Sequence, residues 1–363
     1  MARFSEVLTI INGKNQSKVE NPNGKYPIYG SGGIMGYADE YICEAQTVII
    51  GRKGSINKPI FVETPFWNVD TAFGLSANKD VLLPKYLYYF CEYFDFEKLN
   101  TTVTIPSLTK ANLLNIEMEL PTIEQQQEIV VQLDKVENII SFRKQQLSKL
   151  DELIKARFVE LFGDPRINPK GYDIVPISSL FDVGSSKRVF ESEWRESGVP
   201  FYRAREIVKL SKDGYVDNDL FIEEEMYEAY KAKYGVPKAG DMMVTGVGTL
   251  GVCYIVKETD RFYFKDGNTL WFKNKGLCDV RFIKDQYDTD FVKEQITANA
   301  NVSTVGTYTI TNANNTLVLL PPLAEQGQYV EFCKQTDKSK FEFQQSLEKL
   351  ETLKKALMQK YFG

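Results

Sequence analysis

The sequence has 363 residues, 43% hydrophobic and 26% charged, so it is too long for one ordinary core and too apolar for a disordered chain. It contains no histidine, the side chain most often used for proton transfer near neutral pH, which argues against hydrolytic chemistry without excluding it. The net charge of −5 argues weakly against a nucleic-acid partner, although a basic face can coexist with acidic helices.

The sequence shows no pattern typical of a membrane span, a secretory signal or a disulfide framework. No apolar run approaches the roughly 18–20 residues that cross a bilayer, and the first ten residues lack a secretory signal, so we expect a cytoplasmic protein without a membrane partner. The odd number of cysteines and the lack of a CxxC pair predict ordinary thiols, with no metal site and no disulfide framework. The five are Cys43, Cys91, Cys253, Cys278 and Cys333.

Two copies of one pattern follow each other along the chain. Four segments match in the same order, and the last match places Pro121 against Pro322, an offset of 201 residues. A period this long indicates duplicated domains and not a solenoid. The matching segments are 26–29 with 199–202, 48–56 with 243–250, 108–112 with 310–314, and 121–125 with 322–326.

Each copy begins with a segment rich in β-branched and aromatic residues, and each ends in a long charged helix. The alternation within 47–63 and 253–273, broken by Gly, Asn and Asp, predicts strands, and short helices are expected at 85–93 and 289–298. The predicted fold class is α+β, with a largely antiparallel sheet in each copy. The predicted parts are domain 1 (residues 1–120), a helix (121–163), domain 2 (164–320) and a second helix (321–363).

The first long helix has a clear beginning and end. Thr122 is a candidate N-cap, and Gln125 three residues later completes a capping box. Gly163 followed by Pro165 stops the helix. Apolar residues at alternating spacings of four and three form a heptad seam, in which Arg143 takes the one polar place. The seam residues are Ile129, Leu133, Val136, Ile140, Leu147, Leu150 and Ile154.

The second helix lacks a capping hydroxyl because Leu323 is aligned with Thr122, so we expect its first turns to be less well fixed. A long amphipathic helix cannot bury its stripe alone, so the two helices are expected to pair antiparallel and to separate the β-rich domains. Packing of each helix on its own domain is the alternative. The second seam is Phe343, Leu347, Leu350, Leu353 and Leu357.

This order resembles the specificity subunits of type I restriction–modification systems. The resemblance covers essentially the whole chain. It is carried by the Pro-x-x-Glu-Gln helix starts at 121–125 and 322–326 and by the closing runs KLDELIKARFVELFGDP and KLETLKKALMQKYFG. Two copies of these motifs at matching places are far more specific than either alone.

The resemblance implies a non-catalytic subunit that binds double-stranded DNA. Each globular part would be a target recognition domain for one half of a bipartite, asymmetric site. The helices would set the half-site spacing and dock two methyltransferase subunits, and motor–nuclease subunits would join the assembly. S-adenosylmethionine would be bound by the methyltransferase, with no cofactor on this chain. The alternative is an orphan or inhibitory scaffold that binds methyltransferase subunits without directing modification.

The motifs of the sequence agree with a non-catalytic subunit. The pairs Asn21-Pro22 and Asn168-Pro169 do not continue into an adenine methyltransferase motif and suit turns. The glycine-rich segment 30–36 has its last glycine one place late for a dinucleotide loop, and a flexible turn is the better interpretation. No Walker lysine and no convincing nuclease cluster accompany them.

DNA readers need long donors for base edges and cations, hydroxyls or backbone N–H groups for phosphates. In domain 1 the glycine-flanked loop 51–58 and the segment 102–110 supply such groups, although a solvated hairpin tip would look the same. In domain 2 the matching loop has lost its charges. Alternating arginines at 203 and 205 on a predicted strand would face one groove, or simply form an exposed strand face. The candidates are Arg52, Lys53, Ser55, Asn57, Lys58, Thr104, Ser107, Lys110, Lys187, Arg188, Arg203, Arg205, Thr249, Thr307 and Tyr308.

Overall fold

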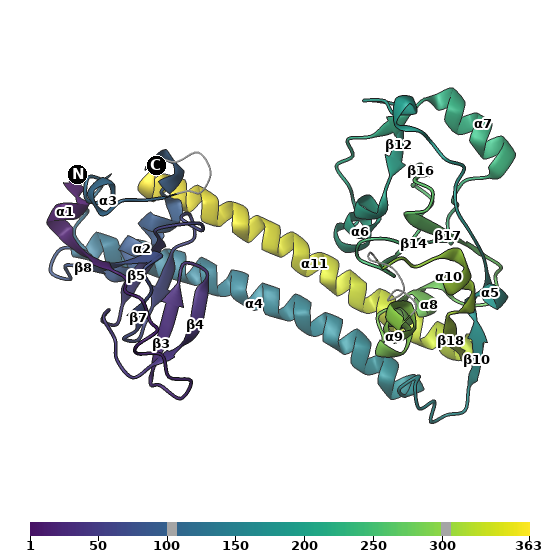
Figure 1. Ribbon diagram of the computed structural model, residues 1–363, viewed down its shortest axis with the longest axis horizontal. Helices are drawn as coiled ribbons and strands as arrows, with labels where there is room; N and C mark the ends of the chain where they lie inside the picture. Colours follow the sequence, from purple (N-terminus) through teal and green to yellow (C-terminus); the bar gives the residue numbers. More distant parts are fainter. Residues whose placement is uncertain (100–106, 299–305) are drawn as a thin grey trace. The chain divides into compact units, whose positions relative to one another are not determined.

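The computed structural model describes residues 1–99, 107–298 and 306–363 and falls into two compact units (Figure 1). Unit 1 comprises Met1–Leu147 with Glu342–Gly363, and unit 2 comprises Ser148–Phe341. Each unit therefore contains one β-rich domain together with a part of both long helices. The sequence-based division at 120, 163 and 320 had set the helices apart from the domains, whereas in the structure they contribute to the domain cores.

Unit 1 contains three small sheets. The four-stranded sheet has the order β2-β8-β5-β6 and is antiparallel throughout, whereas β3 in the three-stranded sheet β4-β3-β7 pairs parallel with β7. The expected antiparallel character is confirmed, but three sheets replace the single one that was expected. The strands are β1 (Ala2–Arg3), β2 (Leu8–Asn12), β3 (Tyr26–Gly30), β4 (Gly33–Ala38), β5 (Thr47–Gly51), β6 (Ile60–Val62), β7 (Trp67–Asn68), β8 (Ala72–Ala77) and β9 (Glu117–Met118).

Strand β5 is buried at all five positions because it lies between two neighbours in the sheet and under a layer of helices. Its side chains Val48 and Ile50 join a core with the aromatic face of α2, which includes Tyr86 and Phe90. The predicted helix at 85–93 is thereby confirmed. The short helices of unit 1 are α1 (Phe4–Val7), α2 (Pro84–Tyr93), a 3₁₀ turn (Phe96–Leu99) and α3 (Lys110–Leu114).

Unit 2 repeats the arrangement. Its sheets have the orders β11-β17-β14-β15, β13-β12-β16 and β10-β18, and β12 pairs parallel with β16 as β3 does with β7. The strands are β10 (Asp173–Pro176), β11 (Phe181–Gly184), β12 (Val199–Tyr202), β13 (Phe221–Ile222), β14 (Met242–Thr245), β15 (Cys253–Ile255), β16 (Tyr263–Phe264), β17 (Thr269–Asn274) and β18 (Leu317–Leu320). The helices are α5 (Ile177–Leu180), a 3₁₀ turn (Glu191–Glu193), α6 (Ala204–Asp213), α7 (Glu224–Tyr234), α8 (Val280–Gln286), α9 (Asp290–Ala298) and α10 (Ile310–Asn315).

The backbone register confirms the duplication and corrects three of its four matches. Segment 26–29 aligns with 199–202 as predicted, because Ile28 and Phe201 take the same place in equivalent parallel pairs. The strand match shifts by one, since Val48 aligns with Met242. The helix caps Thr109 and Thr309 each accept a hydrogen bond from the N–H three residues on, so this segment aligns at 200 and not at 202.

The two long helices, α4 (Ile123–Phe162) and α11 (Leu323–Phe362), also align at 200 residues. Gln126 and Gln326 are each fully buried and make equivalent bonds: each side-chain oxygen accepts the N–H of the residue before the α2 or α8 helix, and each amide nitrogen donates to the carbonyl of Pro121 or Pro321. These bonds fix the beginning of each long helix on its own domain.

The predicted boundaries of α4 are confirmed. The Thr122 hydroxyl accepts the Gln125 N–H at 3.3 Å and the Gln125 side chain accepts the Thr122 N–H at 3.1 Å, which makes a capping box. At the other end Gly163 adopts a φ of +78°, a left-handed conformation that glycine takes without steric cost. Helix α11 has no hydroxyl cap, yet Glu325 in its first turn accepts a hydrogen bond from the Tyr172 hydroxyl at 2.5 Å.

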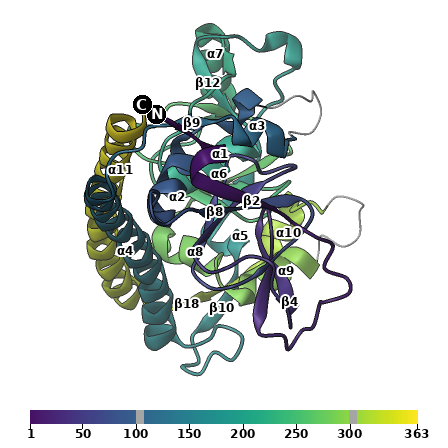
Figure 2. The same cartoon turned by 90° about the vertical axis from the view of Figure 1, so that its left-hand side faces the viewer.

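Within unit 1 the long helices pack side by side and antiparallel. Val136, Ile140 and Leu347 form a buried cluster between them, and Lys144 pairs with Glu351 at 3.0 Å. Figures 1 and 2 show α2 beside both helices. The pairing was predicted, and packing of each helix only on its own domain is excluded for this unit.

Two charged residues, Arg143 and Lys354, lie in the unit 1 seam and are accommodated in different ways. The Arg143 guanidinium lies 4.9 Å from the centre of the Phe343 ring, so the polar place in the heptad is filled by a cation–π contact. Leu353 was predicted to face the seam, but its side chain is 46% exposed. Lys354 lies there instead, because its ammonium bridges Glu137 and Glu92 at 2.6 and 2.7 Å.

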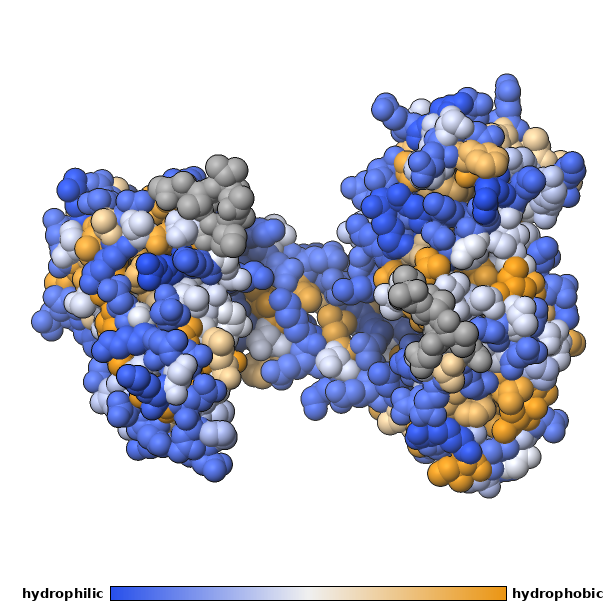
Figure 3. Space-filling view, viewed as in Figure 1, coloured by the Kyte–Doolittle hydropathy of each residue, from blue (hydrophilic) through white to orange (hydrophobic). Residues whose placement is uncertain are grey.

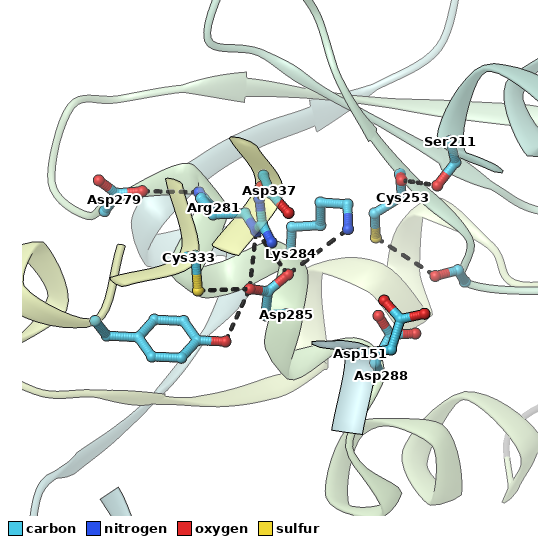
Figure 4. Close-up of polar contacts among 12 residues, drawn as sticks. Asp151, Ser211, Cys253, Asp279, Arg281, Lys284, Asp285, Asp288, Cys333 and Asp337 are labelled. Carbon is cyan, nitrogen blue, oxygen red and sulfur yellow. Dashed lines mark hydrogen bonds and ion pairs between the residues drawn. The ribbon is translucent and has the colours of Figure 1, made fainter. Parts of the chain in front are cut away.

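In unit 2 the end of α4 enters the domain core. Ile154, Phe158 and Phe162 are buried in one cluster with Tyr329 and Cys333 of α11. Below this cluster the carboxylate of Asp285 on α8 accepts hydrogen bonds from Arg281, from the Tyr329 hydroxyl at 2.8 Å and from Cys333 (Figure 4). Arg281 also pairs with Asp337 of α11, so this polar network ties α8 to the helix pair.

A cleft of about 690 Å³ lies beside this network, between α4, α8, α9 and α11. Acidic and basic side chains alternate on its walls, and several are paired, as in the contact of Lys340 with Asp151 at 2.5 Å. No helix in the described part of the chain is long and apolar enough to cross a membrane.

Candidate nucleic-acid interface

Domain 1 presents three exposed cations on the loop between β5 and β6. The backbone at Arg52 is anchored, because its N–H donates to the Thr71 carbonyl at 2.8 Å and its carbonyl accepts the Leu108 N–H at 2.9 Å. Arg52, Lys53 and Lys58 are exposed, and none of them pairs with a carboxylate among residues 1–99, 107–298 and 306–363. A loop that is anchored at Arg52 and whose cations have no carboxylate partner among the described residues is suited to phosphate contacts.

Two other candidates of domain 1 are engaged inside the domain. The Asn57 side chain donates to Asp95 at 3.0 Å and accepts the Phe96 N–H at 2.7 Å, which holds the 3₁₀ turn. The Lys110 ammonium donates to the Ile10 carbonyl at 2.7 Å. Both were predicted as donors to DNA, and both already make hydrogen bonds within the domain, so a contact with DNA remains a prediction for them.

The remaining candidates of domain 1 lie near the cationic loop. Ser55 is exposed on the loop itself, and Ser107 forms a backbone bridge with Lys53. The structure therefore brings Arg52, Lys53, Ser55 and Ser107 together. Thr104 falls outside the described residues.

Domain 2 has a cleft of about 460 Å³ in the corresponding region, here called the arginine cleft. On the face of unit 2 seen in Figure 3, hydrophilic residues predominate and are interrupted by hydrophobic patches. The backbone equivalent of Arg52 is Gly246, whose N–H donates to the Asn268 carbonyl and whose carbonyl accepts the Tyr308 N–H, each at 2.9 Å. The cleft is lined by Arg203, Ala204, Arg205, Val208, Val247, Gly248, Thr249 and Asn268.

The arginines of the cleft do not lie on a strand, which corrects the sequence-based prediction. Arg203 is the residue before α6, and Arg205 lies in its first turn. Both contact Glu206, whose side chain is only 3% exposed, and both contact Asp219. Burial alone would raise the pKa of Glu206, but hydrogen bonds from the two guanidinium groups outweigh burial and lower it.

A second cleft of about 380 Å³, here called the tryptophan cleft, shares Asn268 with the first. Arg188 lines it and pairs with Asp266 at 2.9 Å, while Lys265 lies 5.6 Å from the centre of the Trp194 ring. The structure thus gathers Arg188, Arg203, Arg205 and Thr249 around one turn. Lys187 is exposed beside them, and its backbone N–H donates to the Tyr263 hydroxyl at 3.0 Å.

Tyr308 is a correction. Its side chain is 1% exposed and its hydroxyl contacts Thr316 at 2.7 Å and Tyr287 at 3.1 Å, so it belongs to the core. Its neighbour Thr307 is half-buried, and Thr249 is exposed while its carbonyl accepts the Thr245 hydroxyl. The hydroxyl groups around Tyr308 suggested a surface segment, but the Tyr308 side chain points into the core.

Sequence reasoning missed four residues at the two clefts: Trp194, Asp219, Lys265 and Asn268. The side-chain amide of Asn268 forms no hydrogen bond with any described residue, and the Trp194 indole N–H is buried without a partner in the same part of the chain. An Asp-Gly-Asn turn at 266–268 between two strands was the signal that could have identified this site.

Comparison with known proteins gives a consistent family. The family described as the type I restriction modification DNA specificity domain matches residues 1–152. A type I restriction enzyme specificity subunit from Haemophilus influenzae is 26% identical over 338 residues, covering 90% of this chain and 84% of that protein. The MjaVIII specificity subunit from Methanocaldococcus jannaschii is 24% identical over 340 residues, covering 86% and 75%.

Solved structures share the fold over the full chain. The specificity subunit of a type I restriction–modification system from M. genitalium superposes with a TM-score of 0.63 at 15% identity, covering 100% of this chain and 95% of that one. A chain from a study of the assembly and conformational transition of the type I system gives 0.56 at 14% identity, covering 99% and 96%. With its duplicated domains and its paired long helices, the chain is similar over most of its length to specificity subunits of type I restriction–modification systems, and residues 1–152 match the DNA specificity domain of these systems.

Proposed function

We propose that this chain reads DNA sequence for a type I restriction–modification complex, with each domain reading one half of a bipartite, asymmetric site. One observation carries the proposal: the two domains share a backbone, yet their side chains differ between the loop 51–58 of domain 1 and the corresponding arginine cleft of domain 2. The backbone site of Arg52 in domain 1 is Gly246 in domain 2. Two readers of different half-sites need a common frame with different side chains.

The long helices are proposed to set the half-site spacing and to dock two methyltransferase subunits. Exposed apolar side chains on α4 support docking, because Val131, Ile139 and Phe142 are 40%, 44% and 64% exposed. Val131 and Phe142 lie on the face of the helix opposite the seam residue Ile140, and Ile139 lies beside that face, so a partner helix would cover all three. Motor–nuclease subunits would join the same assembly. S-adenosylmethionine would be held by the methyltransferase, and this chain would contribute recognition and not catalysis.

The decisive experiment is methylome sequencing of cells that express the neighbouring methyltransferase with and without this chain. A split methylated motif that depends on the chain is expected, and it would give both half-sites at once. If no such motif forms with a methyltransferase that is active with another specificity subunit, the chain is an inhibitory scaffold instead.

Binding gives an independent measure of the same function. The complex with its methyltransferase should bind the methylated motif far more tightly than a scrambled duplex at physiological salt, by about 10³-fold or more. Equal affinity for the two duplexes would contradict sequence reading.

A further inference from the structure

Two arginines of the arginine cleft share one exposed carboxylate. One nitrogen of Arg205 contacts both oxygens of Asp219, at 2.7 and 2.8 Å, and a nitrogen of Arg203 contacts one of them at 3.0 Å. The Asp219 side chain is 65% exposed. Two guanidinium groups that together hold one exposed anion can also hold a phosphate, which accepts the same kind of charge-assisted hydrogen bond.

The second carboxylate of this cluster has a different role. Glu206 is 3% exposed and receives the backbone N–H of Arg203 at 2.8 Å as well as both guanidinium groups. It lies beneath the arginines and fixes their direction. Glu206 is therefore a positioning residue, whereas Asp219 occupies the side that faces solvent.

The charges of the cluster cancel, with two arginines against two carboxylates. Contacts at an exposed carboxylate are weak, because water and salt compete for both partners. A DNA phosphate presented at the right place can replace such a carboxylate, since it forms the same charge-assisted bonds. A phosphate presented elsewhere gains too little to do so.

We propose that Arg203 and Arg205 form a site for a backbone phosphate of DNA, and that Asp219 occupies the place of this phosphate until a correctly seated duplex displaces it. The inference rests on the proposed function, because it assumes that domain 2 binds DNA. Asp219 then acts on specificity: it withholds the arginines from non-specific duplexes and releases them in the cognate complex.

The test compares two variants of equal net charge. Asp219→Asn removes the internal anion, while Asp217→Asn removes a charge from an exposed residue of the same segment that makes no ion pair with any described residue. Binding of the full-length chain, in complex with its methyltransferase, to a labelled scrambled duplex is measured by fluorescence anisotropy over a salt series. Asp219→Asn should tighten this binding about 3- to 10-fold at ~0.1 M salt and steepen the salt dependence by about 0.9, one extra phosphate contact.

Asp217→Asn should leave the salt slope unchanged. On the methylated motif, the Asp219→Asn slope should equal that of the unaltered chain, because the cognate complex already uses the arginines. Adding Arg205→Gln to Asp219→Asn should remove the gain on scrambled DNA. Equal slopes for Asp219→Asn and Asp217→Asn on the scrambled duplex would overturn the proposal.

The two hypotheses fail in distinguishable ways. If the unaltered complex prefers no bipartite motif, the proposed function fails, and the scrambled-duplex comparison still decides whether Asp219 competes with phosphate. If a motif is preferred and the two aspartate variants behave alike, only the inference about Asp219 fails.

Discussion

The two domains hold their cations in opposite ways. In domain 1, Arg52, Lys53 and Lys58 extend from an anchored loop without a carboxylate partner among the described residues. In domain 2, Arg188 pairs with Asp266 at 2.9 Å, and the arginines of the arginine cleft pair with acidic groups. A single net charge of −5 therefore conceals one domain whose loop cations have no described carboxylate partner and one in which the cleft arginines are paired with carboxylates. The difference teaches that equivalent backbone positions in a duplicated fold can present their cations in different ways, so we expect the two domains to contribute unequally to binding.

The largest expected difference between the units concerns their cores. Phe162 is fully buried against Phe158, Phe282 and Tyr329, whereas its repeat equivalent Phe362 is only partly buried. Phe162→Ala should lower the free energy of unfolding of unit 2 by about 3–5 kcal/mol, because it leaves a large cavity. Calorimetry of the full chain measures this loss.

Two further variants sharpen that measurement. Phe362→Ala should cost clearly less in unit 1, since part of the ring is already in water. Phe142→Ala, at a side chain that is 64% exposed, serves as the control and should change little. Equal losses from Phe162→Ala and Phe362→Ala would mean that the cores do not differ as described.

Neutralising cations should affect the two domains unequally. Changing Arg52, Lys53 and Lys58 together to Gln should weaken binding to a scrambled duplex by about 10²-fold at ~0.1 M salt and reduce the salt slope by about 2.7, three phosphate contacts. Changing Arg203 and Arg205 to Gln should cost about threefold or less, because their charges are already balanced. Fluorescence anisotropy over a salt series measures the affinity and the salt slope of both sets of variants. A larger loss of affinity from the domain 2 changes would contradict the described difference between the domains.

Base reading gives a narrower test. Asn268 lies on the wall shared by the two clefts of domain 2, and an asparagine amide pairs with the edge of adenine. Asn268→Ala should cost about 1–3 kcal/mol of discrimination at one position of one half-site. Thr71, its backbone equivalent in domain 1, provides the matched Thr71→Ala variant. Methylome sequencing should show relaxation only in the half-site of the altered domain, and unchanged motifs for both variants would contradict these roles.

Lowering the pH should destabilise unit 2 more than unit 1. We expect this to be the smallest of the effects predicted for the two units. Hydrogen bonds from arginine hold the pKa of Asp164, Asp219 and Glu224 below the usual range, and arginine contacts also lower that of Glu206 against its burial. Unit 1 has one described carboxyl with a lowered pKa, Glu124. A lowered pKa adds stability above the ordinary carboxyl pKa, and this stability is lost as the pH falls through the folded value.

The melting temperature of unit 2 should therefore fall by a few degrees more than that of unit 1 between about pH 5 and pH 3. Calorimetry at matched ionic strength measures the shift. A parallel decline of both units would show that the arginine contacts of unit 2 contribute nothing to stability.

The helices and the duplication could be predicted from sequence because both depend on local signals. Alternating apolar spacing gave the seam, and a threonine, a glutamine and a glycine gave the ends of α4. The failure at Leu353 has a physical reason: Lys354 buries its stem in the seam and places its ammonium between Glu92 and Glu137, and no periodicity reveals such a pair.

The clefts were only partly predictable. The cationic loop of domain 1 could be predicted because its charges lie close together in the sequence, whereas Asp219 lies 14 residues beyond Arg205 and contacts it through the fold. Asn57, Lys110 and Tyr308 looked like surface donors, since the sequence does not state which polar groups find internal partners. Three of the four repeat matches were displaced by one or two residues, because loops of different length separate the equivalent strands.

The division of the helices between the units also bears on how the chain matures on the ribosome. Unit 2 is one continuous stretch, Ser148–Phe341, and its core is complete once that stretch has emerged. Unit 1 needs Met358, which is buried in its core and is synthesised after all of unit 2. Domain 1 is therefore translated first but completes its core last. A nascent chain that lacks residues 342–363 would contain a complete second domain and an incomplete first one.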